Sequence, residues 1–206
     1  MTKPDASALA RLLAGAPDNE EDTIARLRTR LADAAEQAGV LDVAYRSIDT
    51  PVGPLLLAAT GQGLVRVAYA SEDHERVLTQ LASRVSPRVL HAPARLDTAA
   101  QEIDEYFAGR RTRFDLPLDM RLATGFRREV LVQLPSIGYG HTASYAAMAA
   151  AAGRPRAFRA AGTACATNPL PVVVPCHRVV KSDGSLGLYA GGVAAKRTLL
   201  TLEGAL

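Results

Sequence analysis

The sequence has little cysteine, no tryptophan and no long hydrophobic run. Its only two cysteines are Cys165 and Cys176, which are too few for a disulfide framework. No apolar run approaches the roughly 20 residues of a membrane helix, so we expect no membrane partner. The first residues turn acidic soon after a short apolar patch, which makes a poor signal peptide. We therefore expect a cytoplasmic protein.

Net charge is also small, at +3, and alone says little about nucleic acid. Its distribution says more, because residues 121–197 hold ten basic side chains against only Glu129 and Asp183. The ten are Arg121, Arg127, Arg128, Arg154, Arg156, Arg159, Arg178, Lys181, Lys196 and Arg197. Such a region suits a phosphate-binding surface. A solvated arginine-rich surface without a ligand is the alternative.

A hydrophobic fraction of 48% is ample for a packed core. Residues 20–38 place apolar side chains at helical spacing, and a shorter helix is expected from Ser7 to Leu13. We assign residues 1–41 to a helical N-terminal extension of unknown role.

From residue 43 the period changes from helical to alternating. Residues 43–49, 54–60 and 64–70 are typical of short strands joined by tight turns. Helices are expected over residues 71–85 and 96–107. We expect an α+β fold in which residues 42–117 form a small antiparallel sheet with helices packed on it.

The rest of the chain, residues 118–206, is predicted to be mostly helical. A helix over 124–134 stops at Pro135, and a second over 142–153 is capped by Thr142 or Ser144. A third opens with Pro155 near its first turn. The last two are consistent with a helix-turn-helix. Any helical hairpin is the alternative, but the basic residues on the second helix favour DNA.

The segment PVVVPCHRVV, residues 171–180, puts one of the two cysteines beside a histidine. Cys176 could close a strand as a small hydrophobe, with Pro175 ending it and His177 and Arg178 facing water. It could instead be a nucleophile, because a neighbouring histidine or arginine lowers a thiol pKa. The segment alone leaves both interpretations open.

The motifs on either side of Cys176 resemble those of a known protein family. An Asn-Pro turn at 168–169 precedes Pro-Cys-His-Arg at 175–178, and a Tyr-x-Gly-Gly loop at 189–192 and Glu203 follow. With the helix-turn-helix upstream, residues 138–203 resemble the C-terminal domain of the O6-alkylguanine-DNA alkyltransferases. The preceding sheet and helices resemble the family's RNase-H-like N-terminal domain.

The resemblance implies irreversible, stoichiometric transfer of an alkyl group from O6-alkylguanine in double-stranded DNA, and also from O4-alkylthymine, to Cys176. No cofactor or metal is implied. His177 would take the thiol proton through a bound water, and Glu203 would orient His177. A thioether sulfur is a poor leaving group, so one molecule acts once.

The resemblance also implies base flipping, with the second helix of the helix-turn-helix in the minor groove. Arg159 would be the wedge that fills the vacated space. Tyr145 would crowd the flipping phosphate and donate a proton to guanine N3. The small or neighbouring residues of the DNA-contacting helix would be Ala157, Phe158, Ala160, Ala161 and Gly162. We expect a monomer in solution and allow for cooperative assembly on DNA.

The implied base pocket has six lining residues: Asn168, Pro169, Val179, Tyr189, Ala190 and Gly191. Backbone amides after Tyr189 would face O6, and the carbonyls of Cys176 and Val179 would accept from the exocyclic amine. Ala190 stands where a serine is frequent in the family, and Phe158 where a small residue is common. No cysteine precedes Cys165, so a zinc site of the kind some relatives carry is not expected. We interpret Cys165 as a small buried filler.

Two other functions are compatible with parts of the sequence. A helix-turn-helix protein could bind alkylated DNA without repairing it, although relatives of that kind lack the reactive cysteine. A cysteine hydrolase is the second alternative, although adjacent Cys and His would be unusual for that class.

Overall fold

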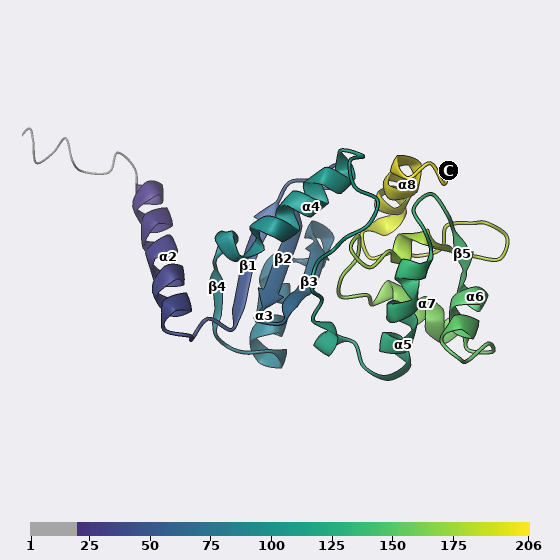
Figure 1. Cartoon of the computed structure of the whole chain (residues 1–206), viewed down its shortest axis with the longest axis horizontal. Helices are drawn as coiled ribbons and strands as arrows, with labels where there is room; N and C mark the ends of the chain where they lie inside the picture. Colours follow the sequence, from purple (N-terminus) through teal and green to yellow (C-terminus); the bar gives the residue numbers. More distant parts are fainter. Residues whose placement is uncertain (1–19) are drawn as a thin grey trace, which may run out of the picture.

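The computed structural model describes residues 20–206 (Figure 1). The helix predicted from Ser7 to Leu13 lies outside the described residues. Helix α2, Glu20–Gln37, confirms the second predicted helix of the extension and stands at the end of the molecule away from α6 and α7 (Figure 1). Ala32 and Ala35 are buried against the rest of the chain, whereas Leu27 and Leu31 are more than half exposed, at 56% and 57%.

The sheet has the strand order β3-β2-β1-β4. The three predicted strands are present as β1, Val43–Ile48, β2, Leu55–Thr60, and β3, Gly63–Tyr69, and they pair antiparallel. A fourth strand, β4, Val89–His91, pairs parallel with β1 and was not predicted. Three residues are too few to show an alternating pattern, so no periodicity marks β4 as a strand.

The two faces of the sheet bury separate sets of side chains, as the alternation of strand residues requires. On one face, Leu56 and Val65 pack with Val77 and Leu81 of helix α3, His74–Arg84. On the other face, residues such as Leu57 join a larger core that includes helix α4, Asp97–Phe107. The predicted α+β class is confirmed.

The edge strand β3 is covered by the chain that leads into the second half. Leu64 N donates to Pro117 O at 2.8 Å, and Asp119 N donates to Leu64 O at 2.8 Å. Gly63 has a φ of +131°, and a Cβ there would lie 2.2 Å from Pro117 O, so only glycine fits. The pairing protects an edge that would otherwise expose unpaired backbone groups. A domain boundary after residue 117 stays a prediction.

The second half contains helices α5, Gly125–Gln133, α6, Tyr145–Ala151, α7, Phe158–Ala166, and α8, Gly192–Leu202. Two short strands, β5, Ala143–Ser144, and β6, Val179–Val180, pair in parallel. Ser144 is the N-cap of α6, since its hydroxyl accepts from Ala147 N at 3.1 Å. The helix ends before Gly153, whose φ is +75°.

One local prediction and one of the two open interpretations of residues 171–180 were wrong. Helix α7 begins at Phe158 rather than at Pro155, because residues 155–156 form a turn in which Ala157 N donates to Arg154 O at 2.9 Å. The apolar residues 171–174 form a buried turn rather than a strand. Val172 has a φ of +71° there, which is unusual for a β-branched residue and breaks any extended conformation.

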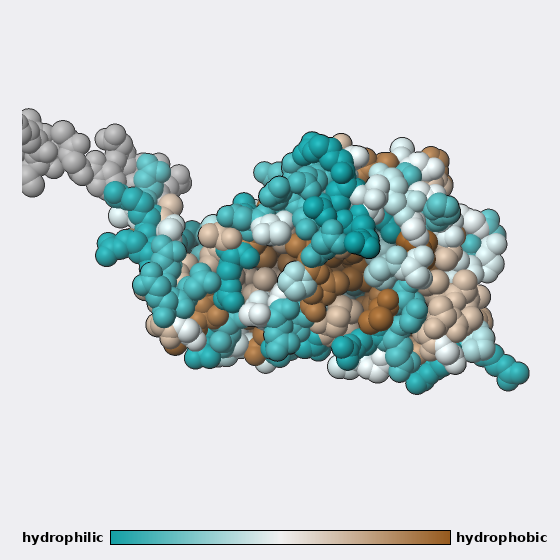
Figure 2. Space-filling view, viewed as in Figure 1, coloured by the Kyte–Doolittle hydropathy of each residue, from teal (hydrophilic) through white to brown (hydrophobic). Residues whose placement is uncertain are grey.

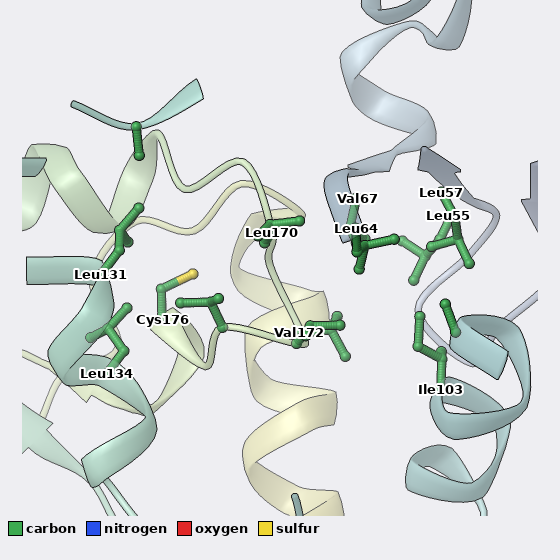
Figure 3. Close-up of a cluster of buried hydrophobic side chains, with 14 of the residues drawn as sticks. Leu55, Leu57, Leu64, Val67, Ile103, Leu131, Leu134, Leu170, Val172 and Cys176 are labelled. Carbon is green, nitrogen blue, oxygen red and sulfur yellow. The ribbon is translucent and has the colours of Figure 1, made fainter. Parts of the chain in front are cut away.

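One continuous core joins the two halves. Figure 3 shows Leu57 and Ile103 of the first half in the same cluster as Leu131 and Leu170 of the second. On the face in Figure 2, hydrophobic surface gathers in the middle of the molecule beneath a hydrophilic ridge over α4. Within residues 20–206, every helix is too short or too polar to cross a membrane.

Candidate active site and DNA-binding helix

Cys176 is the first residue of a 3-10 turn, Cys176–Arg178, that follows Pro175. Its side chain is 1% exposed and lies among Leu131, Leu134 and Leu170 (Figure 3). The thiol has one polar partner among the described residues, because Asn168 Nδ2 donates to Sγ at 3.1 Å.

Asn168 is itself fixed by the turn that follows it. Its Nδ2 also donates to Val174 O at 2.8 Å, and its Oδ1 accepts from Leu170 N at 2.9 Å. Asn168 is 2% exposed, so these contacts replace solvent. The family resemblance predicted Asn168 in the base pocket, which stays a prediction, and the structure shows that its amide contacts the thiol.

Burial raises the pKa of the Cys176 thiol to about 11. The hydrogen bond from Asn168 and the positive charge of Lys196 oppose this rise without overcoming it. The resting side chain is therefore a neutral thiol at neutral pH. A nucleophilic role requires a group that removes the proton.

His177 is fully buried, and its Nε2 lies 2.9 Å from Glu203 Oε1. Burial lowers the pKa of His177, although the hydrogen bond to Glu203 partly opposes the shift. The imidazole is therefore neutral at neutral pH. Because a carboxylate only accepts, Nε2 carries the hydrogen and Nδ1 holds the lone pair. Nδ1 has no hydrogen-bond partner within the described part of the chain.

Glu203 follows α8 and collects several donors in a buried position. Arg178 donates through Nε to Oε2 at 2.8 Å and through Nη2 to Oε1 at 3.0 Å. Burial alone would raise the pKa of Glu203, but the hydrogen bonds of His177 and Arg178 outweigh it and the pKa falls to about 2. Glu203 is thus an ionised carboxylate held in place beside His177.

Two of the cations counted toward a phosphate-binding surface are buried instead. Arg178 pairs with Glu203 and donates through Nη1 to Ile137 O at 2.6 Å, so the interpretation in which it faces water is wrong. Lys196 Nζ donates to Val179 O at 2.5 Å and also to Leu186 O. Burial lowers the pKa of Lys196, whereas a thiolate at Cys176 would raise it. Neither side chain is available to DNA.

Of the predicted pocket residues, Asn168 contacts the thiol directly, and Tyr189 contacts the neighbouring His177. Tyr189 is 8% exposed, and its ring stands edge-on to His177 with centroids 6.3 Å apart. Ala190 and Gly191 follow it and are partly exposed. Both carbonyls expected to accept from the base already have a donor, since Cys176 O accepts from Val179 N and Val179 O from Lys196. Each would have to offer its second lone pair.

Pro169 has a different position from the rest of the predicted pocket. It is buried, and its carbonyl accepts from Val67 N at 2.8 Å and from Arg66 Nη1 at 3.2 Å. Pro169 therefore attaches the turn beside the thiol to strand β3 of the first half.

Tyr145 begins helix α6 and is half-buried. Burial raises its pKa to about 12, so its hydroxyl keeps its proton at neutral pH. The centre of its ring lies 6.0 Å from Lys196 Nζ. Gly187, with a φ of +66°, approaches so closely that a Cβ there would lie 2.8 Å from the tyrosine hydroxyl.

Helix α7 presents its first turn to solvent. Arg159 is exposed, and its guanidinium lies 5.7 Å from the centre of the Phe158 ring, which is 48% exposed. Ala157, Ala160 and Gly162 are exposed or partly exposed, which leaves the backbone approachable. Ala161 was expected on the same surface but is fully buried, because it lies on the opposite side of the helix.

Cys165 also lies on the buried side of α7 and is 3% exposed. Burial raises its pKa to about 12, so it is an unreactive thiol. Its prediction as a buried filler is confirmed.

Two tyrosines of the first half reach the site and were not predicted. Tyr106, on α4, donates from its hydroxyl to Glu203 Oε1 at 2.6 Å and lies 3.5 Å from His177 Nε2. Tyr69, the last residue of β3, lies 2.9 Å from Tyr189, hydroxyl to hydroxyl. Both occupy ordinary core positions in the sequence pattern. Nothing local distinguishes them, because their partners are about 100 residues away in the chain.

Two family models match the chain in succession. The ribonuclease-like domain of 6-O-methylguanine DNA methyltransferase matches residues 43–120, and the DNA binding domain of the same family matches residues 125–205.

Similar proteins carry consistent names. A methylated-DNA–protein-cysteine methyltransferase of Mycobacterium tuberculosis is 40% identical over 159 residues, which cover 77% of this chain and 91% of the relative. A bifunctional transcriptional activator/DNA repair enzyme, Ada, of Escherichia coli is 33% identical over 98% of this chain and 58% of its own length. A crystal structure of M. tuberculosis OGT in complex with DNA aligns with a TM-score of 0.69 at 39% identity, over 79% of this chain and 93% of that one. The chain therefore belongs to the 6-O-methylguanine DNA methyltransferase family.

Proposed function

We propose that the chain repairs duplex DNA by moving the alkyl group of O6-alkylguanine, or of O4-alkylthymine, onto Cys176 Sγ. One observation carries the proposal. A buried thiol oriented by Asn168 is followed directly by a buried neutral histidine, and an ionised Glu203 holds that histidine from behind. The arrangement is that of a nucleophile, a base and an orienting group.

The proton has a route from the thiol. His177 Nδ1 holds a free lone pair and takes the thiol proton through a bound water. Glu203 stabilises the imidazolium that forms, and its own low pKa keeps it ionised throughout. The sulfur then attacks the alkyl carbon, so that the S–C bond forms as the C–O6 bond breaks.

The electron pair of the broken C–O6 bond goes to the departing guanine. Tyr145 donates its hydroxyl proton to guanine N3 and regains a proton from solvent, and His177 releases to solvent the proton that it took from the thiol. Overall the thiol loses one proton, guanine gains one, and the alkyl group ends on sulfur. A thioether has no route back to a thiol here, so each molecule transfers one group.

Delivery of the base is proposed to depend on α7. A base stacked in a duplex is out of reach of a buried thiol, so the base must be flipped out. Arg159 is exposed at the start of the helix, where it can enter the space that the base leaves. The small residues Ala157, Ala160 and Gly162, which are exposed or partly exposed, support a close approach to the minor groove, whose sequence readout is largely degenerate. Phe158 lies beside Arg159 and is proposed to contact DNA as well.

Intact-mass measurement after incubation with O6-methylguanine duplex tests this function. We expect every molecule to gain one methyl group, and peptide mapping to place it on Cys176. Cys176→Ser should gain none and still bind the duplex, since the binding helix is unchanged. An unchanged mass with tight binding would instead support a binding module, and turnover of an ester substrate would support a cysteine hydrolase.

A further inference from the structure

Tyr69 belongs to the first half of the chain but lies at the base pocket of the second. It ends β3, and its side chain is 2% exposed. Its hydroxyl lies 2.9 Å from that of Tyr189, and the two rings meet edge-on with centroids 5.7 Å apart at 72°. An aromatic contact with a hydrogen bond at its tip fixes both the position and the rotation of the partner ring.

The ring of Tyr69 also stands directly behind the pocket loop. A Cβ added to Gly191 would lie 2.6 Å from Tyr69 Cε1 and Cζ, so the loop backbone rests on the ring. The loop cannot shift toward Tyr69 unless that ring moves. A side chain at position 191 would force that movement, which explains glycine there.

Tyr69 is in turn held by its own half. Its backbone N donates to Glu72 Oε1 at 3.0 Å, and Glu72 pairs with Arg66. Two residues earlier in β3, Val67 N donates to Pro169 O at 2.8 Å. The strand that presents Tyr69 is therefore attached to the turn that carries Asn168, so the ring is fixed relative to the thiol.

Charge at the reacting sulfur also acts on the Tyr69 hydroxyl. Burial raises the pKa of Tyr69 and of Tyr189, and negative charge at Cys176 raises both further. Tyr189 also contacts His177 through the edge-on ring pair. Any shift of Tyr69 is therefore transmitted to the loop, to the ring of Tyr189 and to the space beside the sulfur.

We propose that Tyr69 is a positioning and specificity-determining residue, which fixes the Tyr189–Gly192 loop and so limits the size of the alkyl group accepted beside Cys176. The inference rests on the proposed transfer to Cys176 and deepens it. It means that a residue of the first half, which lacks the reactive cysteine, limits the size of the substrate that the second half accepts.

Two variants separate the ring from its hydroxyl. Transfer rates are measured on one duplex carrying either O6-methylguanine or O6-benzylguanine. Tyr69→Phe keeps the ring and loses the bond to Tyr189, so both rates should fall by about threefold to tenfold with their ratio unchanged. Tyr69→Ala removes the support behind Gly191, so the benzyl-to-methyl rate ratio should rise by about fivefold or more.

Leu56→Ala is the matched control, because Leu56 is equally buried in the sheet but packs on the α3 side. It should lower stability and leave the rate ratio at the wild-type value. If Tyr69→Ala does not fold, Tyr69→Leu provides a smaller opening with the same direction of change.

A wild-type ratio in the folded Tyr69→Ala or Tyr69→Leu variant, or a change equal to that of Leu56→Ala, would overturn the inference. Failure of the wild-type protein to gain a methyl group at Cys176 is a different result. It would refute the proposed function itself.

Discussion

The first turn of α7 and the buried network around Glu203 use the same residue type in opposite ways. Arg159 is exposed, and no carboxylate pairs with it in the part of the chain that the structure describes. Arg178 is 6% exposed and gives two hydrogen bonds to one carboxylate. An exposed cation without a paired carboxylate is available to phosphates, whereas the buried Arg178 fixes the carboxylate beside His177.

The contrast predicts different energetics for the two regions. Interactions of exposed charges are weak and screened by salt. Breaking a buried ion pair leaves an uncompensated charge, which is strongly destabilising. Changes in the buried network should therefore alter stability and pH dependence, and changes in α7 should alter only what happens on DNA.

The largest effect is expected for Glu203→Gln. The change leaves Arg178 buried without its counter-charge, so the free energy of unfolding in urea should fall by about 3–5 kcal/mol. Glu129→Gln is the control, because Glu129 is half-exposed and its contact with Arg154 is long, at 3.8 Å. It should change stability by less than about 0.5 kcal/mol. Equal effects of the two substitutions would contradict the contrast.

The same carboxylate predicts how stability depends on pH. The pKa of Glu203 is depressed from 4.5 to about 2 in the folded chain. Its contribution, about 3 kcal/mol, is present above the unfolded pKa and is lost as pH falls from about 4.5 through 2. Urea titrations should therefore show wild type and Glu203→Gln converging in acid. If the difference in free energy of unfolding between the two proteins stays constant down to pH 2, the neighbours of Glu203 do not lower its pKa.

A smaller effect is expected from the second buried cation. The charge of Lys196 lowers the pKa of Cys176, so Lys196→Met should move the reaction of the thiol with iodoacetamide to higher pH. Arg197→Met, at the exposed next position, should leave the pH profile unchanged. Overlapping profiles for Lys196→Met and wild type would show that the lysine acts only through its hydrogen bonds to backbone carbonyls.

The smallest effect is expected for Phe158→Ala. Because the ring is 48% exposed, the melting temperature should hardly change. Loss of a DNA contact should weaken duplex binding by about 1 kcal/mol, measured by fluorescence anisotropy. A clear loss of thermal stability with unchanged binding would show that the ring packs on the protein instead.

The parts of the fold and of the candidate site that depend on neighbouring residues in the sequence could be predicted. Alternating residues predicted β1, β2 and β3, and capping and breaking residues predicted α6 and, apart from its first residue, α7. The Pro-Cys-His-Arg motif and the Asn-Pro turn indicated the thiol and its surroundings. Strand β4 and the turn at Val172 were missed because one is too short and the other has an apolar composition typical of a strand.

The sequence could not predict which charged side chains are buried. Arg178 and Lys196 are indistinguishable from surface cations until the fold brings Glu203 and the backbone carbonyls to them. Tyr69 and Tyr106 were missed for the same reason, since each contacts a partner in the other half. Long-range contacts of this kind leave no periodicity in the sequence around either residue.

The central claim is that the buried network performs the transfer and the exposed turn of α7 delivers the base. The most direct test is the ratio of the transfer rate on methylated duplex to the rate with free O6-benzylguanine base in Arg159→Ala. Unstacking a paired base costs a few kcal/mol, so the duplex rate should fall by about tenfold or more while the free-base rate stays within about twofold. In His177→Asn both rates should fall together. An Arg159→Ala variant that slows both substrates equally would contradict the account.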